Sequence, residues 1–465
     1  MPTSQPPLEL WGGVECTINR VHDLFFDQLE LSGHRERVAA DLQLVRDLGL
    51  QTMRTPILWE HLEATQSWEF PDLLLAHMER LGIRPIVGLL HHGSGPPSTS
   101  LLDPAFPEKL AAFALKVAQR YPHVLDYTPV NEPHTTARFS ALYGFWYPHE
   151  RSIVSYLRAL LHEIKATVLA MRAVRTVQLD ARLIYTEDGG TFFSTPELRS
   201  FCIEREHRRW LGTDLLTGRV VGTHPLFSYL LGHGIDEEEI LWFAANPCPP
   251  SILGLNYYVT SDRFLDHRLH LYPSHLAGGD EGSEPLVDFE AIRIRPEGIA
   301  GVQTLLTEAW QRYGIPVAIT EAHLGAEPAE QRRWLREVWQ HSQAARLTGV
   351  DVRAVTVWAL LGSSNWCNLC TSDTGTYEPG VFDLSSGVPV PTPLASLVSE
   401  LAHGDADLLP PDQTLDSPAH GWWHQPSRIV MHPSGDNPPP EEPDSLMTRP
   451  NGHPDQQPAP QVLTC

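Results

Sequence analysis

Residues 126–134 read Asp-Tyr-Thr-Pro-Val-Asn-Glu-Pro-His, an aromatic and β-branched run that leads into Asn131 and Glu132. Pro133 follows at once. Because proline cannot donate a hydrogen bond to a sheet ladder, it belongs just beyond the end of a strand. The stretch therefore predicts a buried strand whose carboxyl end carries Glu132.

A second carboxylate has the same setting far along the chain. Residues 315–321 read Ile-Pro-Val-Ala-Ile-Thr-Glu, a short apolar run that ends on Glu321 before a predicted loop. Short runs of this kind, rich in β-branched residues, are typical of buried strands. The sequence thus predicts two acids, each at the end of a buried strand.

Apolar runs of strand length alternate with helical patterns along most of the chain. The predicted strands are 8–14, 52–58, 83–90, the strand that ends with Glu132, 182–186, 251–258, 315–321 and 352–361. The predicted helices are 38–48, 72–80, 107–120, 153–175, 197–216, 298–313 and 329–348. Strands that are apolar on both faces and alternate with helices favour a parallel sheet. Eight such units close a (β/α)8 TIM barrel of the α/β class, whose sites lie at the carboxyl ends of the strands, and a doubly wound open sheet is the structural alternative.

Two stretches interrupt this alternation. Residues 261–296 contain Gly, His and Asp, and we expect them to form an irregular insertion over the mouth of the barrel. From residue 403 the chain is rich in Pro, Asp, Gly and Gln with few core-forming residues, which favours a disordered tail. The predicted organisation is one barrel over residues 1–402 and a tail over residues 403–465.

The composition narrows the choice of partner and compartment. A formal net charge of −23 over 465 residues argues against nucleic-acid and anionic-membrane partners, since both need basic patches. The first residues lack the pattern of a signal peptide and no apolar run approaches the length that spans a bilayer, so we expect a cytoplasmic protein. Six scattered cysteines do not resemble a disulfide scaffold. Cys367 and Cys370 have C-x-x-C spacing, but no second pair accompanies them, which favours ordinary thiols over a metal or redox site.

Two carboxylates that meet in one barrel mouth can hydrolyse a glycosidic bond. One carboxylic acid protonates the leaving oxygen, and a second carboxylate attacks or stabilises the sugar cation. In retaining enzymes the two groups lie about 5 to 5.5 Å apart. For either Glu132 or Glu321 alone, a solvated loop acid or a structural ion pair would be the simpler interpretation. Their matched settings favour catalysis.

Several separated motifs resemble those of family 1 glycoside hydrolases, the retaining β-glycosidase family, over about residues 10–384. Residues 128–133, Thr-Pro-Val-Asn-Glu-Pro, are similar to the family's acid/base motif T-x-N-E-P. Residues 319–321, Ile-Thr-Glu, resemble the start of its nucleophile motif I-T-E-N-G. The resemblance implies that Glu132 is the acid/base and that Glu321 is the nucleophile.

The resemblance extends to residues that would surround this pair. Arg54 falls where the family has an arginine near the nucleophile, and Tyr258, in the Asn-Tyr-Tyr run at 256–258, falls where a tyrosine orients it. The implied substrate-binding residues are His91, Asn131, which would hold the 2-hydroxyl, Asn256, and the two tryptophans Trp358 and Trp366, which would serve as platforms for the sugar. The simpler alternatives are an ion pair at the core edge for Arg54 and packing roles for Tyr258 and the tryptophans. A metal at His91 and its neighbouring histidine is the less favoured alternative, because no third ligand follows with recognisable spacing.

The sequence also departs from the family pattern. His92 replaces the tryptophan of the family's H-W-D motif, and Asn365 replaces a glutamate that binds the outer sugar hydroxyls. Asn19 falls at the place of a sugar-binding glutamine, although a backbone-capping role is an open alternative, and Glu15 replaces a small residue nearby. Residues 322–323, Ala-His, stand where the family has Asn-Gly. These changes put ordinary glucoside specificity in doubt and favour an unusual sugar, such as a deoxy or modified one.

The resemblance therefore implies a retaining β-glycosidase that hydrolyses O-glycosidic bonds by double displacement and needs no cofactor or metal. Its partner would be a carbohydrate substrate. A sugar-binding protein with reduced catalysis and a transglycosidase on the same fold are the alternatives. An association with nucleotide-sugar enzymes is a further hypothesis from the resemblance.

Overall fold

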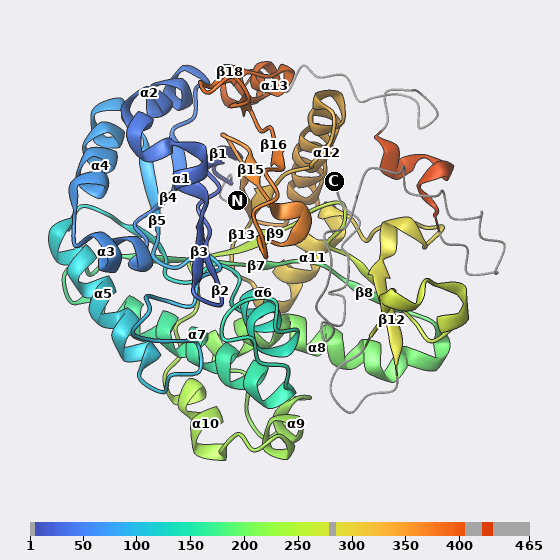
Figure 1. Cartoon of the computed structure of the whole chain (residues 1–465). Coiled ribbons are helices and arrows are strands. Elements are labelled where there is room, and N and C mark those ends of the chain that lie inside the picture. The colour runs from blue at the N-terminus through green and yellow to red at the C-terminus, as the bar shows by residue number, and fades with distance from the viewer. Residues whose placement is uncertain (1–4, 279–284, 405–420, 431–465) are drawn as a thin grey trace, which may run out of the picture.

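Eight parallel strands form a closed barrel in the computed structural model, which describes residues 5–278, 285–404 and 421–430 (Figure 1). The strands follow one another around the barrel in chain order, and the last pairs with the first. They are β1 Glu9–Gly13, β4 Thr52–Pro56, β5 Arg84–Gly88, β6 Asp126–Thr128, β7 Arg182–Asp188, β9 Ile252–Asn256, β13 Val317–Ala322 and β14 Val352–Val357. The predicted (β/α)8 TIM barrel is confirmed, and the alternative of an open doubly wound sheet is wrong.

Helices cover the outside of the barrel, with at least one between each pair of successive barrel strands (Figure 1). The long ones are α2 His34–Asp47, α4 Glu69–Leu81, α5 Phe106–Arg120, α7 Ile153–Arg175, α8 Arg199–Leu216, α11 Val302–Tyr313, α12 Pro328–Leu347 and α13 Pro393–Ala402. The shorter ones are α1 Gln28–Ser32, α3 Trp59–Thr65, α6 Pro133–Ala137, α9 Phe227–Gly232 and α10 Glu237–Ala245. Every predicted helix overlaps one of the long helices. Within the described ranges, none of the helices combines the length and apolarity that crossing a membrane requires.

Buried side chains from several strands pack together in the barrel interior. Trp11 on β1 lies in one cluster with Ile86, Ile184, Ala318 and Ala354, all of them buried. The two alanines on β13 and β14 leave room for the large indole of Trp11, as layers of unequal side chains do in such barrels. This layer closes the barrel beneath the carboxyl ends of the strands, where the inward-facing residues become polar.

The insertion at residues 261–296 contains a small sheet, so the expectation of an irregular insertion is wrong for this part. β10 (Arg263–Asp266) pairs antiparallel with β12 (Leu286–Glu290), and β8 (Phe192–Ser194) and β11 (Ala277–Gly278) complete the order β11-β12-β10-β8. Phe192, Leu265 and Leu286 are buried together against residues at the start of α8. The strands have two to five residues each, which is too short for a periodic pattern to stand out. Residues 279–284 lie outside the described residues.

Part of the predicted tail is folded against the barrel. Residues 421–430 contain two short 3₁₀ turns, and the indole of Trp423 is buried and donates to Glu337 on α12 at 2.8 Å. The guanidinium of Arg428 donates to the backbone carbonyls of Ile292, Arg295 and Pro296 at 2.6, 2.9 and 2.7 Å. The prediction of a disordered tail is therefore wrong for residues 421–430, which tie the insertion to α12. Residues 405–420 and 431–465 lie outside the described residues.

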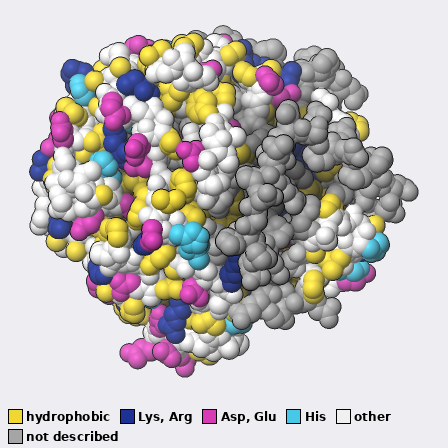
Figure 2. Space-filling model, in the orientation of Figure 1, with side chains coloured by type: hydrophobic (Ala, Val, Ile, Leu, Met, Phe, Trp, Pro, Cys, Tyr) yellow, Lys and Arg dark blue, Asp and Glu magenta, His cyan; other side chains and the backbone are white. Residues whose placement is uncertain are grey.

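The outer surface mixes side chains of all kinds. On the described part of the face in Figure 2, acidic and basic side chains are interspersed with apolar ones. The polar residues of interest are instead gathered inside, at the carboxyl ends of the barrel strands.

Candidate active site

Glu132 lies at the point where the chain leaves β6 and begins α6. Its backbone has φ of 45°, a left-handed conformation that is uncommon for a residue with a side chain and costs on the order of 1 to 3 kcal/mol. Two backbone hydrogen bonds hold it, from Glu132 N to Thr186 O at 3.1 Å and from Thr136 N to Glu132 O at 2.9 Å. The strand end and the first turn of α6 thus fix the direction of the Glu132 side chain into the mouth.

Glu321 lies on β13 where that strand departs from regular pairing. The register with β9 shifts between Ile319 and Glu321, which is how a strand can re-aim a side chain. Arg54 Nη1 donates to Thr320 O at 2.8 Å and to Glu321 Oε1 at 2.7 Å, and the hydroxyl of Tyr258 donates to Glu321 Oε2 at 2.5 Å. Both oxygens of Glu321 are therefore held, one by Arg54 of β4 from across the barrel and the other by Tyr258, which follows the neighbouring strand β9.

Two asparagines connect the carboxylates. Asn256 Nδ2 donates to Glu132 Oε1 at 2.5 Å, and Asn131 Oδ1 accepts from Arg54 Nη2 at 2.6 Å. The two amides also touch, with 3.5 Å between Asn256 Nδ2 and Asn131 Oδ1. A continuous set of hydrogen bonds therefore runs from Glu132 through Asn256, Asn131 and Arg54 to Glu321.

The two carboxyl groups have unequal electrostatic surroundings. Burial raises the pKa of Glu132 well above its ordinary value, and the charges of Glu321, Asp188 and Glu187 raise it further. Burial also raises the pKa of Glu321, but the Arg54 guanidinium and the hydrogen bond from Tyr258 oppose that rise. Because a cation lies beside Glu321, whereas the charges near Glu132 are those of other acids, Glu132 holds a proton more tightly and Glu321 is the more readily ionised of the two.

His91 and Trp358 form one wall of the site. The imidazole stacks on the indole with 5.5 Å between ring centroids and 7° between planes, and its Nε2 lies 3.3 Å from Asn131 Nδ2. Trp358 Nε1 donates to Glu15 Oε2 at 3.2 Å, and the Arg54 guanidinium lies 4.9 Å from the ring centre. Trp358 therefore supports His91 and Arg54 directly, which is a role beyond the predicted sugar platform.

Residues 364–370, which we call the covering segment, lie across the mouth from strand β2 (Ile18–Val21). Asn19 Nδ2 donates to Cys370 O at 3.0 Å, Trp146 Nε1 to Leu369 O at 2.7 Å, and Gln28 Nε2 to Ser364 O at 2.7 Å. Glu132 is 5% exposed and Glu321 is 2% exposed. The carboxylates are therefore shielded from solvent in this conformation.

Three of the predicted site residues belong to the covering segment or bond to it: Asn365 and Trp366 lie in it, and Asn19 donates to Cys370 O. Asn365 accepts from Thr374 N at 2.9 Å and donates to Asp373 at 3.0 Å, so it braces its own loop. Trp366 is half-buried, with its ring centroid 5.4 Å from that of His92. The structure thus brings together Glu132, Glu321, Arg54, Tyr258, Asn131, Asn256, His91 and Trp358, and places Asn19, Asn365 and Trp366 at the rim.

The sequence reasoning missed several polar neighbours. Thr186 and Thr320 donate to the amide oxygens of Asn131 and Asn256 at 2.8 and 2.7 Å and so orient both side chains. Each threonine ends an apolar run of strand type, and that position was the available signal. Glu187 accepts from His134 N at 3.0 Å at the start of α6, and burial raises its pKa to about 7. Glu187 thus caps the backbone at the start of α6.

Comparison with known proteins bears on the fold. No protein-family model matches the sequence. Among solved structures the chain is similar to the family 1 β-glucosidase from Thermotoga maritima, with a TM-score of 0.68 and 16% identity over 87% of this chain and 99% of that chain. The fold is that of a family 1 β-glucosidase. The same Thermotoga maritima enzyme matches in its complex with deoxynojirimycin, with a TM-score of 0.67 and 16% identity over 87% and 99% of the two chains. Its complex with isofagomine lactam matches with a TM-score of 0.67 and 16% identity over 86% and 99%.

Proposed function

We propose that this protein is a retaining β-glycosidase that hydrolyses O-glycosidic bonds of a carbohydrate substrate. The observation that carries the proposal is the hydrogen-bonded connection of Glu132 and Glu321, in which the Arg54 guanidinium lies within ion-pair distance of Glu321. Among the described residues, the basic group at ion-pair distance from Glu132 is the imidazole of His92, whose pKa is lowered to about 3. An acid that keeps its proton beside a carboxylate that loses it is the combination that glycoside hydrolysis needs. The family 1 fold, whose relatives include β-glucosidases, supports the proposal.

The first step forms a covalent intermediate. A carboxylate oxygen of Glu321 attacks the anomeric carbon while Glu132 transfers its proton to the glycosidic oxygen, so that the bond from the anomeric carbon to that oxygen breaks and the aglycone leaves as an alcohol. In the second step Glu132, now a carboxylate, takes a proton from a water molecule that attacks the same carbon. The ester to Glu321 breaks, and both side chains return to their starting state.

The neighbours of Glu321 have defined parts in these steps. Arg54 keeps Glu321 ionised before the attack, and the Tyr258 hydroxyl holds the second carboxylate oxygen so that the first is aimed at the substrate. Asn131 would bind the sugar 2-hydroxyl. In the structure the amide nitrogen of Asn131 contacts Nε2 of both His91 and His92. A sugar hydroxyl that binds this nitrogen must therefore displace one of the two histidine contacts.

The rim of the site supports an altered sugar specificity. Asn19 and Asn365, which fall where the resemblance places residues for sugar hydroxyls, hydrogen-bond to the protein's own loop. A glycone with fewer hydroxyls to satisfy at that end, such as a deoxy sugar, would leave these contacts intact. We therefore expect deoxy or modified sugars to be preferred over ordinary glucosides.

The experiment that tests the proposal is a panel of aryl β-glycosides that differ in the sugar, including fucosides and other deoxy sugars, with release of the phenol as readout. The wild type should turn over at least one member. Glu321→Gln should abolish turnover, because an amide cannot attack, and Glu132→Gln should lose most turnover of substrates with poor leaving groups. Glu79→Gln, which alters an exposed acid on the outer helix α4, is the matched control. Full turnover by Glu321→Gln would refute the nucleophile assignment.

Product analysis separates the alternatives. In the presence of added alcohols or sugars, a transglycosidase would give new glycosides in excess of free sugar. A sugar-binding protein with reduced catalysis would bind members of the panel without releasing phenol. The association with nucleotide-sugar enzymes stays a prediction from the resemblance.

A further inference from the structure

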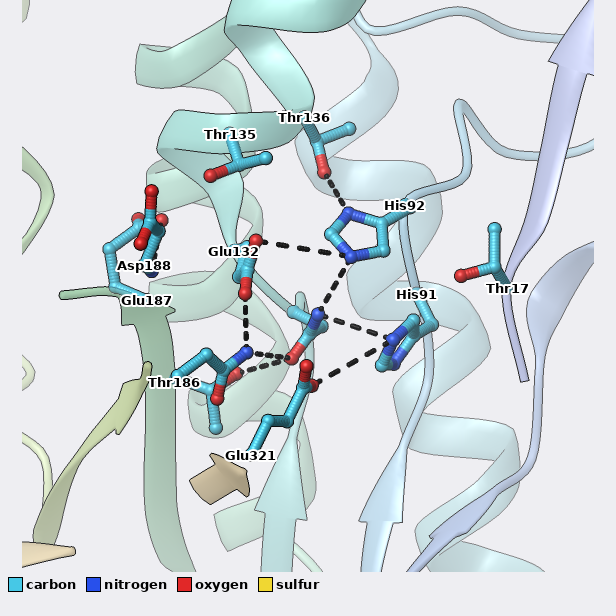
Figure 3. Close-up of polar contacts among 12 residues, drawn as sticks. Thr17, His91, His92, Glu132, Thr135, Thr136, Thr186, Glu187, Asp188 and Glu321 are labelled. Atoms are coloured by element: carbon cyan, nitrogen blue, oxygen red, sulfur yellow. Dashed lines mark hydrogen bonds and ion pairs between the residues drawn. The ribbon is translucent and has the colours of Figure 1, made fainter. Parts of the chain in front are cut away.

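His92 stands where the resemblance leads one to expect a tryptophan. It lies next to Glu132, the proposed acid/base. Its Nδ1 is 3.1 Å from Thr136 Oγ1, and its Nε2 is 3.3 Å from Asn131 Nδ2 and 3.9 Å from Glu132 Oε2 (Figure 3). The ring is 5% exposed and makes edge contacts with Trp146 and Trp366, at centroid distances of 5.5 and 5.4 Å. The imidazole is thus fixed on every side.

The hydrogen-bond directions around His92 fix its tautomer. Arg54 has only donors, so the amide group that it contacts at 2.6 Å is the oxygen of Asn131, and the Asn131 nitrogen must face the histidines. His92 Nε2 therefore accepts, and the ring proton lies on Nδ1 and is donated to Thr136 Oγ1. Burial and the charge of Arg54 lower the pKa of His92 to about 3, so the imidazole is uncharged.

The same reasoning places the proton of Glu132. Its Oε1 accepts a hydrogen bond from Asn256 Nδ2, which leaves Oε2 as the oxygen that carries the acidic hydrogen. Oε2 is the oxygen that lies 3.9 Å from His92 Nε2, beyond hydrogen-bond distance. The unprotonated nitrogen carries partial negative charge, which repels a carboxylate oxygen more than a protonated one, so the neighbour favours the protonated acid.

We propose that His92 is a positioning residue for the acid step, whose uncharged imidazole disfavours early loss of the proton from Glu132. The proposal rests on the glycosidase function and assigns to this chain a device that a tryptophan could not supply, since an indole has no basic nitrogen lone pair. His92 acts through Glu132 and needs no contact with the substrate.

Other ionisable groups face the same carboxyl, and the test must separate them from His92. They are Glu321 from β13, Glu187 and Asp188 from β7, and Tyr258 from the end of β9. His92 itself faces Glu132, the neighbouring imidazole of His91 and the guanidinium of Arg54. Substitution of His92 alone leaves all the other groups in place.

Two substitutions of His92 provide a matched pair. His92→Phe keeps the ring and removes both nitrogens, whereas His92→Gln keeps an acceptor oxygen near the place of Nε2. The measurement is kcat/KM over pH for one sugar carrying either a phenyl or a 2,4-dinitrophenyl leaving group, because only the former needs an acid. His92→Phe should lower kcat/KM about 10- to 100-fold for the phenyl glycoside and less than about 3-fold for the dinitrophenyl glycoside. The alkaline limb of the pH profile of kcat/KM should move to lower pH in His92→Phe.

The controls give each outcome a meaning. His92→Gln should recover most of the loss, and His162→Phe, at a buried histidine of α7 that bonds Leu101 O, should show no dependence on the leaving group. Equal losses for the two leaving groups, or an unmoved alkaline limb, would overturn the proposal and leave His92 a packing residue.

A titration that needs no turnover keeps the two proposals distinguishable. In the full chain labelled with carboxyl-¹³C glutamate, the Glu132 signal is identified by its loss in Glu132→Gln. The pH at the midpoint of the Glu132 titration should fall in His92→Phe and stay near the wild-type value in His92→Gln. An unchanged midpoint in His92→Phe overturns the role of His92. A wild type that cleaves no aryl glycoside refutes the glycosidase proposal, while the midpoint still decides whether His92 acts on Glu132.

Discussion

In the proposed mechanism, single residues decide which carboxyl acts as acid and which as nucleophile. Glu321 has a guanidinium and a phenol as partners, whereas Glu132 has an amide and other acids around it. The same residue type thus acquires two roles from its neighbours. Substituting a neighbour should change the chemistry without changing either acid.

Tyr258→Phe tests this at one atom. Removal of the hydroxyl that donates to Glu321 Oε2 should lower kcat/KM about 10- to 100-fold, and should raise the pKa of Glu321 so that the acid limb of the pH profile moves to higher pH. Tyr121→Phe, which removes a similar hydrogen bond to Asp72 between α4 and α5, is the control and should leave the profile unchanged. An acid limb that stays in place in Tyr258→Phe would show that the phenol does not support the carboxylate.

At the scale of elements, the covering segment is held by side chains from distant parts of the chain. Three of its residues, Asn365, Leu369 and Cys370, have φ of 59°, 56° and 50°, although none is glycine. Such conformations persist only where surrounding contacts hold them, and here the side chains of Asn19, Gln28 and Trp146 supply those contacts. Under the proposed function, we expect this segment to move when a sugar enters.

Gln28→Leu should loosen the segment, because the Gln28 amide bonds both Ser364 O, at 2.7 Å, and Ser364 N, at 3.0 Å. Loss of these hydrogen bonds should speed amide exchange of residues 364–370 by roughly 5- to 50-fold and raise kcat/KM more than kcat. Exchange measured by mass spectrometry provides the readout, and Gln43→Leu on the exposed face of α2 is the control. Unchanged exchange in the segment would mean that Gln28 does not hold it closed.

For the molecule as a whole, buried acids make the stability depend on pH. Glu60 on α3 is 4% exposed and accepts from Gly95 N at 3.0 Å, and burial raises its pKa to about 8. The folded state therefore binds this proton more tightly than the unfolded state does. The contribution of Glu60 is fully present below the unfolded pKa and is lost as pH rises through about 8.

Glu60→Gln should remove that loss. Relative to the wild type, the free energy of unfolding of the variant should increase between pH 5 and pH 9 by up to about 4 kcal/mol. Urea unfolding at the two pH values measures the difference, and Glu79→Gln at an exposed position of α4 is the control. A difference between variant and wild type that is the same at both pH values would contradict a protonated Glu60.

The barrel and the central acids were predictable from local patterns, whereas the rim was not. Apolar runs that end in polar residues identified β6 and β13 and placed Glu132 and Glu321, because strand ends are encoded by neighbouring residues. The bond between Asn19 and Cys370 joins residues 351 positions apart, and no local pattern encodes such a contact. The docked tail did carry a signal, since Trp422 and Trp423 stand together in a polar, Pro-rich stretch. The tautomer of His92 beside Glu132 could be assigned only once the orientation of the Asn131 amide was known.

The most direct test of the account is the configuration of the sugar at the moment of its release. Proton NMR of the wild-type reaction with its best aryl β-glycoside should show the β-anomer first, followed by slow mutarotation to the α-anomer, because attack by Glu321 and then by water inverts the carbon twice. First appearance of the α-anomer would contradict a covalent role for Glu321.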